Sequence, residues 1–100
     1  MAATKSLLVH PLAWEEINAA DQWYFRRSPE ASDTFIVEIT QAVERISQTP
    51  RLWPIYLHGT RRCILHRFPF SVVYLDDEDA IHIVAVAHHK RRPGYWGQRI

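Results

Sequence analysis

Residues 61–88, RRCILHRFPFSVVYLDDEDAIHIVAVAH, decide the fold because they contain three apolar runs separated by turn residues. Isoleucine, valine, leucine and aromatic residues dominate each run, which is typical of β-strands. Pro69 marks the first turn, and four consecutive acidic residues mark the second. Because short turns join antiparallel neighbours, the sequence predicts three antiparallel strands at residues 61–68, 70–75 and 80–88.

The last of these runs is apolar on both of its expected faces. Strict alternation would place the odd-numbered residues 81–87 on one face and the even-numbered residues 82–88 on the other. A strand with two apolar faces is typical of the interior of a sheet. We therefore expect this strand to be central rather than at an edge.

The residues before position 61 predict one strand and two helices. Residues 5–9 form a short apolar run that ends before Pro11, and they predict a strand. Pro11 is suited to a helix start, and this helix should stop near Arg27 and Ser28. Ser28 and Pro29 then read as the N-cap and first residue of a second helix, which Pro50 ends.

Each predicted helix has an apolar face, and together they predict an α+β fold. Trp14, Ile17, Asp21 and Tyr24 share a face of the first helix, and residues 35–46 carry an apolar stripe of helical period. Residues 50–60 contain two prolines and one glycine, so we expect a loop. The predicted architecture is an N-terminal strand and a helical hairpin packed on a mainly antiparallel sheet, with a short C-terminal tail.

Composition predicts a single domain, residues 1–100, from a reducing compartment. The chain has 100 residues, 47% of them hydrophobic, and one cysteine, so no disulfide can form within it. Neither a signal sequence nor an apolar run of about 20 residues is present, so we expect a cytoplasmic protein without membrane association. We expect no cofactor. Adjacent histidines do not share a strand face, so His88 and His89 do not indicate a metal site either.

Charge is distributed unevenly along the chain. Residues 1–50 contain four basic and seven acidic residues, a balance of −3, whereas residues 51–100 contain eight basic and four acidic residues, a balance of +4. The four acids of the second half are adjacent, which leaves its other segments basic. Such a half favours an anionic partner, either nucleic acid or an acidic protein segment. The alternative is an ordinary solvated surface.

Two C-terminal motifs resemble the ParE/RelE superfamily of toxins from type II toxin–antitoxin systems. Residues 61–74 are similar to the family's arginine-rich strand, Phe-Pro-aromatic turn and tyrosine-containing strand. Residues 81–96 resemble its closing strand and its Ala-Val-x-His-x-x-Arg-x-Pro-x-aromatic end, and His10-Pro11 matches a common ParE-like opening. The resemblance implies a toxin that an antitoxin neutralises by wrapping a C-terminal segment around it.

The resemblance leaves two targets open, because RelE-like members cleave mRNA on the ribosome and ParE-like members poison DNA gyrase. Cleavage through a 2′-hydroxyl needs proton carriers and cations. The residues that a nuclease would use here are His88, His89, Arg61, Arg67 and Tyr95. However, a lysine-rich face is missing and residues 46–60 contain no acid, which weakens this alternative.

Inhibition of gyrase by binding needs a basic surface with aromatic residues and no proton chemistry, so it is the favoured prediction. An inactive relative that only binds its antitoxin is a third alternative. The predicted target-binding residues are Arg61, Arg67, Lys90, Arg91, Arg92, Tyr95 and Trp96. Trp96 would serve either as an exposed anchor or as a cap on the helical hairpin. The mechanism requires that the cations of the first hairpin strand and those after the last strand converge.

An antitoxin would bury apolar groove residues and pair its acids with arginines. The predicted antitoxin-binding residues are Trp14, Tyr24 and Phe35, together with Arg61 and Arg67. Trp23 is expected in the core or in this groove.

Overall fold

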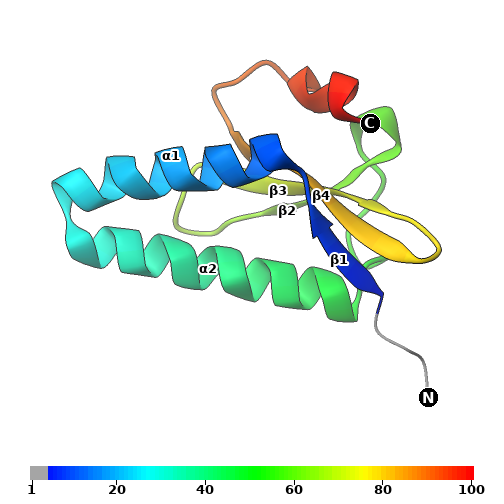
Figure 1. The fold of residues 1–100 in the computed structure, drawn as a ribbon, viewed down its shortest axis with the longest axis horizontal. Coiled ribbons are helices and arrows are strands. Elements are labelled where there is room, and N and C mark those ends of the chain that lie inside the picture. The colour runs from blue at the N-terminus through cyan, green and yellow to red at the C-terminus, as the bar shows by residue number, and fades with distance from the viewer. Residues whose placement is uncertain (1–4) are drawn as a thin grey trace.

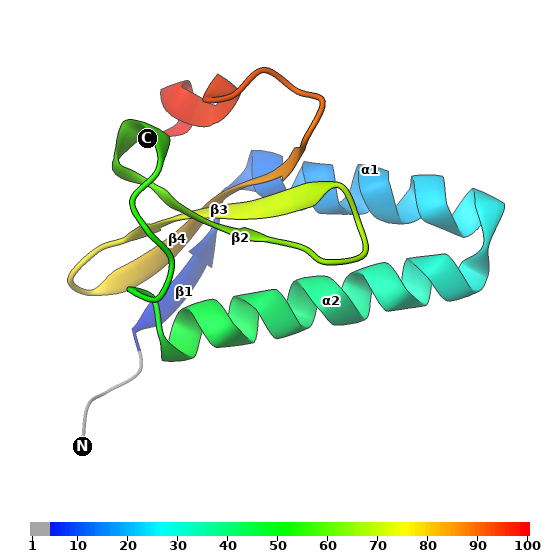
Figure 2. The same cartoon turned by 180° about the vertical axis from the view of Figure 1, so that it is seen from behind.

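The computed structural model describes residues 5–100, which form a helical hairpin packed on a four-stranded sheet (Figures 1 and 2). The sheet has the order β1-β4-β3-β2, with β1 parallel to β4 and the other neighbours antiparallel. The elements are β1 (Ser6–Val9), α1 (Pro11–Arg27), α2 (Pro29–Gln48), η1 (Leu57–Gly59), β2 (Arg61–Ile64), β3 (Phe70–Asp76), β4 (Ala80–His88) and η2 (Tyr95–Arg99). The predicted α+β architecture and the central position of the last strand are confirmed.

Capping residues set the bounds of the two helices. The His10 side chain accepts a hydrogen bond from the Leu12 N–H at 3.0 Å, and Pro11 is the first residue of α1. Ser28 ends α1 by donating its N–H to the Tyr24 carbonyl, and its hydroxyl accepts from the Ala31 N–H to start α2. One residue therefore forms the joint of the hairpin, as the sequence predicts.

The hairpin covers one face of the sheet, called here the helix face. From α2, Phe35, Ile39, Ala42 and Ile46 are buried there, as their spacing predicts. From α1, the buried residues are Ala13, Ile17 and Ala20. The predicted apolar face of α1 is therefore wrong in part: Trp14 is 53% exposed. Small alanine side chains let the α1 backbone lie close to β4. The face of α1 that packs on the sheet is therefore the one with Ala13 and Ala20, and Trp14 lies outside it.

The opposite face of the sheet, called here the arm face, is covered by the C-terminal arm, residues 89–100, and by the loop before β2 (Figure 2). Trp96 is buried against Val73, Val84 and Ala85, and it contacts the Tyr56 ring with centroids 5.7 Å apart. The fold therefore has apolar clusters on both sides of β4. Within residues 5–100, neither helix has the length and apolar character needed to cross a membrane.

Two strand details differ from the predictions. First, β2 ends at Ile64 rather than at Phe68, because the following residues leave the ladder and form a turn. Second, Val73 pairs with Ala85 and Tyr74 with Ile83, so Val84 has no partner on β3. This bulge moves the residues after it to the other face. Odd-numbered residues 81 and 83 therefore face the helices, whereas 85 and 87 face the arm.

Candidate partner-binding and cationic surface

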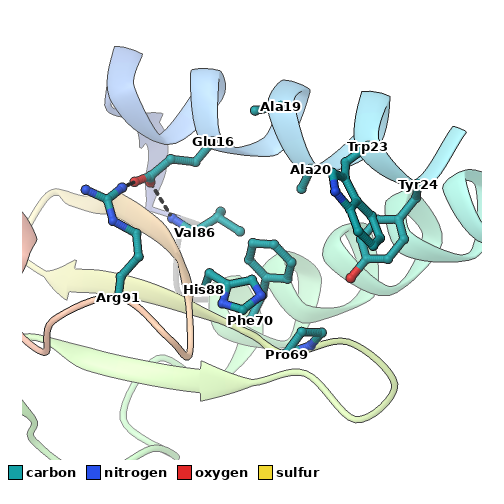
Figure 3. Close-up of a pocket in the computed structure, with 10 residues that line it drawn as sticks. All are labelled: Glu16, Ala19, Ala20, Trp23, Tyr24, Pro69, Phe70, Val86, His88 and Arg91. Carbon is teal, nitrogen blue, oxygen red and sulfur yellow. Dashed lines mark hydrogen bonds and ion pairs between the residues drawn. The ribbon is translucent and has the colours of Figure 1, made fainter. Parts of the chain in front are cut away.

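A groove of about 420 Å³ lies between α1 and the free edge of β4 (Figure 3). Its lining is mostly apolar and comes from α1, from the β2–β3 turn and from the ends of β3 and β4. The lining residues are Glu16, Ala19, Ala20, Trp23, Tyr24, Pro69, Phe70, Val86, His88 and Arg91. Figure 3 shows Trp23 and Tyr24 at one end and the pair of Glu16 and Arg91 at the other.

The β4 edge is open in this groove because β1 is short. β1 pairs with residues 80–83 only, and the His10 N–H makes the last hydrogen bond, to the Ile83 carbonyl at 2.9 Å. Beyond it, side chains replace a neighbouring strand: Glu16 accepts from the Val86 N–H at 3.0 Å, and Arg99 donates to the Val84 carbonyl at 3.1 Å. By strand alternation, the Val86 carbonyl and the His88 N–H lie on this same edge.

Glu16 collects donors from the C-terminal arm as well as from β4. One carboxylate oxygen accepts from Arg99 at 3.0 Å, and the other accepts from Tyr95, Arg91 and Arg99 at 2.5, 3.2 and 3.0 Å. The Glu16 side chain is only 13% exposed. Burial and its hydrogen bond to Glu16 raise the pKa of Tyr95, and the hydrogen bonds from Arg99 to Glu16 raise the pKa of Arg99. Glu16 thus joins α1, β4 and the arm.

A second carboxylate fixes the turn between β2 and β3. Glu38 of α2, itself 9% exposed, accepts from the backbone N–H groups of His66 and Arg67. This turn contacts the start of the arm, because the His89 N–H donates to the Pro69 carbonyl at 2.8 Å. Arg67 and the basic run, defined as Lys90, Arg91 and Arg92, therefore lie at the same end of the sheet.

Most of this cationic end is exposed and unneutralised. Arg67 and all three residues of the basic run are exposed. Arg91 pairs with Glu16 and lies over the Tyr95 ring, with its guanidinium carbon 3.7 Å from the centroid. Among the ion pairs of residues 5–100, none involves Arg67, Lys90 or Arg92. The arrangement can bind anions, and no group of at least three His, Cys, Asp or Glu residues in this part of the chain is placed to hold a metal ion.

Comparison with known families agrees with this architecture. A family model described as the ParE toxin of the type II toxin–antitoxin system parDE matches residues 7–93. The chain belongs to the ParE toxin family.

A solved structure also shares the ParE fold. It is described as the chromosomal ParDE TA system from P. aeruginosa, and it superposes with a TM-score of 0.74 at 22% identity. The match covers 85% of this chain and 96% of the other, and at this identity it shows the fold alone. A search of curated proteins found no match.

The structure separates the arginines that the sequence grouped in this ParE-family toxin. Arg61 pairs with Tyr74 at the far end of β2, and its guanidinium donates to the Trp53 carbonyl at 2.5 Å. Arg62 lies over the Tyr56 ring, 4.1 Å from its centroid. Of the arginines expected to converge with the basic run, Arg67 lies on the turn at the same end of the sheet, whereas Arg61 lies at the other end and holds the preceding loop in place.

The five residues proposed for a nuclease do not form one cluster. The His88 ring is edge-on to Phe70 at 4.9 Å, whereas His89 contacts the Ser71 hydroxyl at 2.9 Å on the arm side of the sheet. Tyr95 is bound to Glu16, and Arg61 lies at the opposite end of the strands. Burial, with smaller effects of Lys90 and His89, lowers the pKa of His88.

Of the other aromatic residues proposed for partner binding, one lines the groove, one is exposed elsewhere and two are buried. Tyr24 lines it, and Trp14 is exposed elsewhere on α1. Phe35 is fully buried beneath the hairpin and Trp96 is 2% exposed, so neither offers surface to a partner in this conformation. Trp96 also packs on the arm face rather than on the helical hairpin, because the arm folds back over the bulged part of β4.

Sequence reasoning missed Glu16 and Glu38 as residues that build this surface. A signal was present, because each acid lies on or beside an apolar helical stripe: Glu16 precedes Ile17, and Glu38 follows Phe35 by three residues. An acidic side chain at such a position is costly unless it is paired, so it indicates a specific partner. The identity of those partners depends on tertiary structure.

Proposed function

We propose that this ParE-family toxin inhibits DNA gyrase by binding, through the cationic end formed by Arg67 and the basic run. The observation that carries the proposal is the 2.8 Å hydrogen bond from the His89 N–H to the Pro69 carbonyl, which joins the turn that carries Arg67 to the start of the arm. A localised cationic surface favours a target that is acidic or that holds DNA, and it accelerates association with such a target.

The scattered proton carriers support binding rather than RNA cleavage. General acid–base catalysis requires groups that reach one reacting centre and that exchange protons near neutral pH. His88 and His89 lie on different sides of the sheet, and the raised pKa of Tyr95 makes its hydroxyl a poor proton donor. A ribosome-dependent mRNA endonuclease is the alternative function. In that reaction the nucleophile is the 2′-hydroxyl of the bound RNA, so the toxin does not have to supply one.

An antitoxin segment is the partner that best fits the groove between α1 and β4. The free edge at Val86 and His88 suits an extended backbone, and Trp23, Tyr24 and Phe70 suit a large apolar side chain. An acidic residue of this segment would meet Arg91, whose side chain is 52% exposed. Binding there would cover one residue of the basic run and would thereby weaken target binding.

The gyrase proposal is tested with purified toxin in a DNA supercoiling assay. We expect inhibition by the wild type and at least tenfold weaker inhibition by Lys90→Ala/Arg92→Ala. Arg26→Ala/Arg51→Ala is the matched control, because it removes the same charge from exposed positions elsewhere. A wild type that fails to inhibit supercoiling would overturn the proposal. Expression without antitoxin then separates the alternatives, since codon-positioned mRNA cuts indicate the nuclease and normal growth indicates an inactive relative.

The groove is tested by filling it. Ala19→Trp places a bulky side chain in the groove without altering the core, because Ala19 is exposed and lines it. We expect at least tenfold weaker binding of the antitoxin in calorimetry. Asn18→Trp, at the neighbouring exposed position outside the groove, is the control. Equal affinities of the two variants would exclude this groove as the antitoxin site.

A further inference from the structure

Both helices direct one carboxylate to the sheet, and each carboxylate fixes a basic segment. Glu16 of α1 accepts from the Val86 N–H and from three side chains of the arm. Glu38 of α2 accepts from two successive backbone N–H groups of the β2–β3 turn. The basic run follows Val86 in the chain, and its Arg91 also donates to Glu16. Arg67 is one of the two residues whose backbone N–H groups donate to Glu38. The acids are thus placed to order the cations without being exposed themselves.

The burial of these acids needs an explanation, because a charged carboxylate removed from water is destabilising unless hydrogen bonds compensate it. For Glu16 the compensation is extensive, since Arg91, Tyr95 and Arg99 all donate to it. A buried network of this kind is in general no more stabilising than well-packed apolar residues of similar volume. The carboxylate is therefore better explained by what it holds than by the stability it adds.

A second contact holds the arm beyond the basic run. The His58 ring lies against Gly94 and Gly97, and a Cβ atom at Gly97 would be only 2.9 Å from its Nε2 atom. His58 itself has a positive φ of 58°. The basic run is therefore held between β4 on one side and the contacts of Glu16 and His58 on the other.

We propose that Glu16 and Glu38 are positioning residues that fix the two basic segments in one binding geometry. The proposal rests on the proposed function for its consequence at the target, but its structural part does not. Its electrostatic signature is distinctive, because neutralising either acid makes the surface more positive. Charge alone would then strengthen binding to an acidic or DNA-bound target, whereas loss of positioning weakens it.

Glu16→Gln and Glu38→Gln test the proposal, with Glu15→Gln and Glu44→Gln as controls that make the same charge change at exposed positions of the same helices. In hydrogen-exchange mass spectrometry of the toxin alone, we expect at least tenfold faster exchange in residues 86–100 for Glu16→Gln and in residues 65–70 for Glu38→Gln. Both controls should exchange like the wild type. Unchanged protection in the two test variants would overturn the proposal.

Inhibition of supercoiling supplies the second measurement. We expect weaker inhibition by Glu16→Gln and Glu38→Gln and equal or stronger inhibition by the controls. Inhibition that strengthens in all four variants would show that charge alone matters and would overturn the positioning role. If the wild type does not inhibit gyrase, the proposed function fails, and the exchange measurement still decides whether the acids fix these segments.

Arg99→Gln provides a second test of the proposal if the Glu16→Gln protein does not fold. This variant removes donors from the arm and leaves Glu16 with Arg91 and Tyr95 as partners. We expect faster exchange in the arm but unchanged exchange in β3. Wild-type exchange in the arm of Arg99→Gln would count against the proposal.

Discussion

Neighbouring residues of this toxin differ sharply in their surroundings, as His88 and His89 show. His88 lines the groove with its ring against Phe70, whereas His89 is exposed and contacts Ser71. Burial is the largest cause of the lowered pKa of His88, and the positive charge of Lys90 is the next. Sequence adjacency therefore does not determine the surroundings of a histidine side chain.

We expect the pKa of His88 in the folded protein to lie below its ordinary value of 6.5. The folded protein then binds this proton less tightly than the unfolded chain, so the free energy of unfolding decreases as pH falls below 6.5. Proton NMR titration of the imidazole measures the shift, and Lys90→Ala should raise the pKa toward 6.5. Arg26→Ala, which removes a distant charge, should leave it unchanged.

At the scale of elements, the sequence predicts what depends on local pattern. The joint at Ser28 follows from a capping residue before a proline, and the α2 face follows from the spacing of Phe35, Ile39 and Ile46. The early end of β2 does not follow, because Glu38 of a distant helix stabilises the turn. The bulge at Val84 is also unpredictable, since it depends on how β3 pairs.

The candidate site was predictable only in part for the same reason. Arg67 and the basic run are recognisable as a basic C-terminal half, and Tyr24 as a groove residue. That Arg61 binds a loop carbonyl, and that Trp96 is buried, follow from contacts made by segments without regular periodicity. The residues that hold the surface together were hidden because their partners lie as many as 83 positions away.

Ser28→Ala tests the joint of the hairpin. The change removes the hydroxyl that accepts from the Ala31 N–H and donates to Glu30, so we expect a loss of about 1 kcal/mol of unfolding free energy, within the range of about 0.5–2 for such caps. Urea denaturation measures it. Ser47→Ala, within the last turn of α2, should change stability by less, and an equal loss in the two variants would contradict the capping role.

At the scale of the whole molecule, the sheet is the central layer, and its inner strand β4 has buried apolar residues on both faces. The helices cover one face and the arm covers the other, with Trp96 as its largest buried residue. The arm is therefore part of the fold as well as the carrier of the basic run. A chain of 100 residues buries only a modest fraction of its surface when it folds. The burial of Trp96 is therefore important for the free energy of unfolding.

Trp96→Ala should destabilise the protein by about 3–5 kcal/mol, as is typical for truncating a buried aromatic residue. Trp14→Ala is the matched control, because Trp14 is 53% exposed and surface changes typically remain within about 0.5 kcal/mol. Urea denaturation followed by far-UV circular dichroism compares them. Similar midpoints for the two variants would show that the arm does not stabilise the sheet.

The parallel pairing of β1 with β4 has a consequence for synthesis of the chain on the ribosome. Residues 6–9 find their hydrogen-bonding neighbours only at positions 80–83, and the α1 carboxylate meets its last donor at position 99. Such distant pairings form slowly and only after the intervening chain is available. A nascent chain therefore cannot complete this fold until residues 80–99 have left the exit tunnel, so the N-terminal strand and the first helix wait for partners that are synthesised much later.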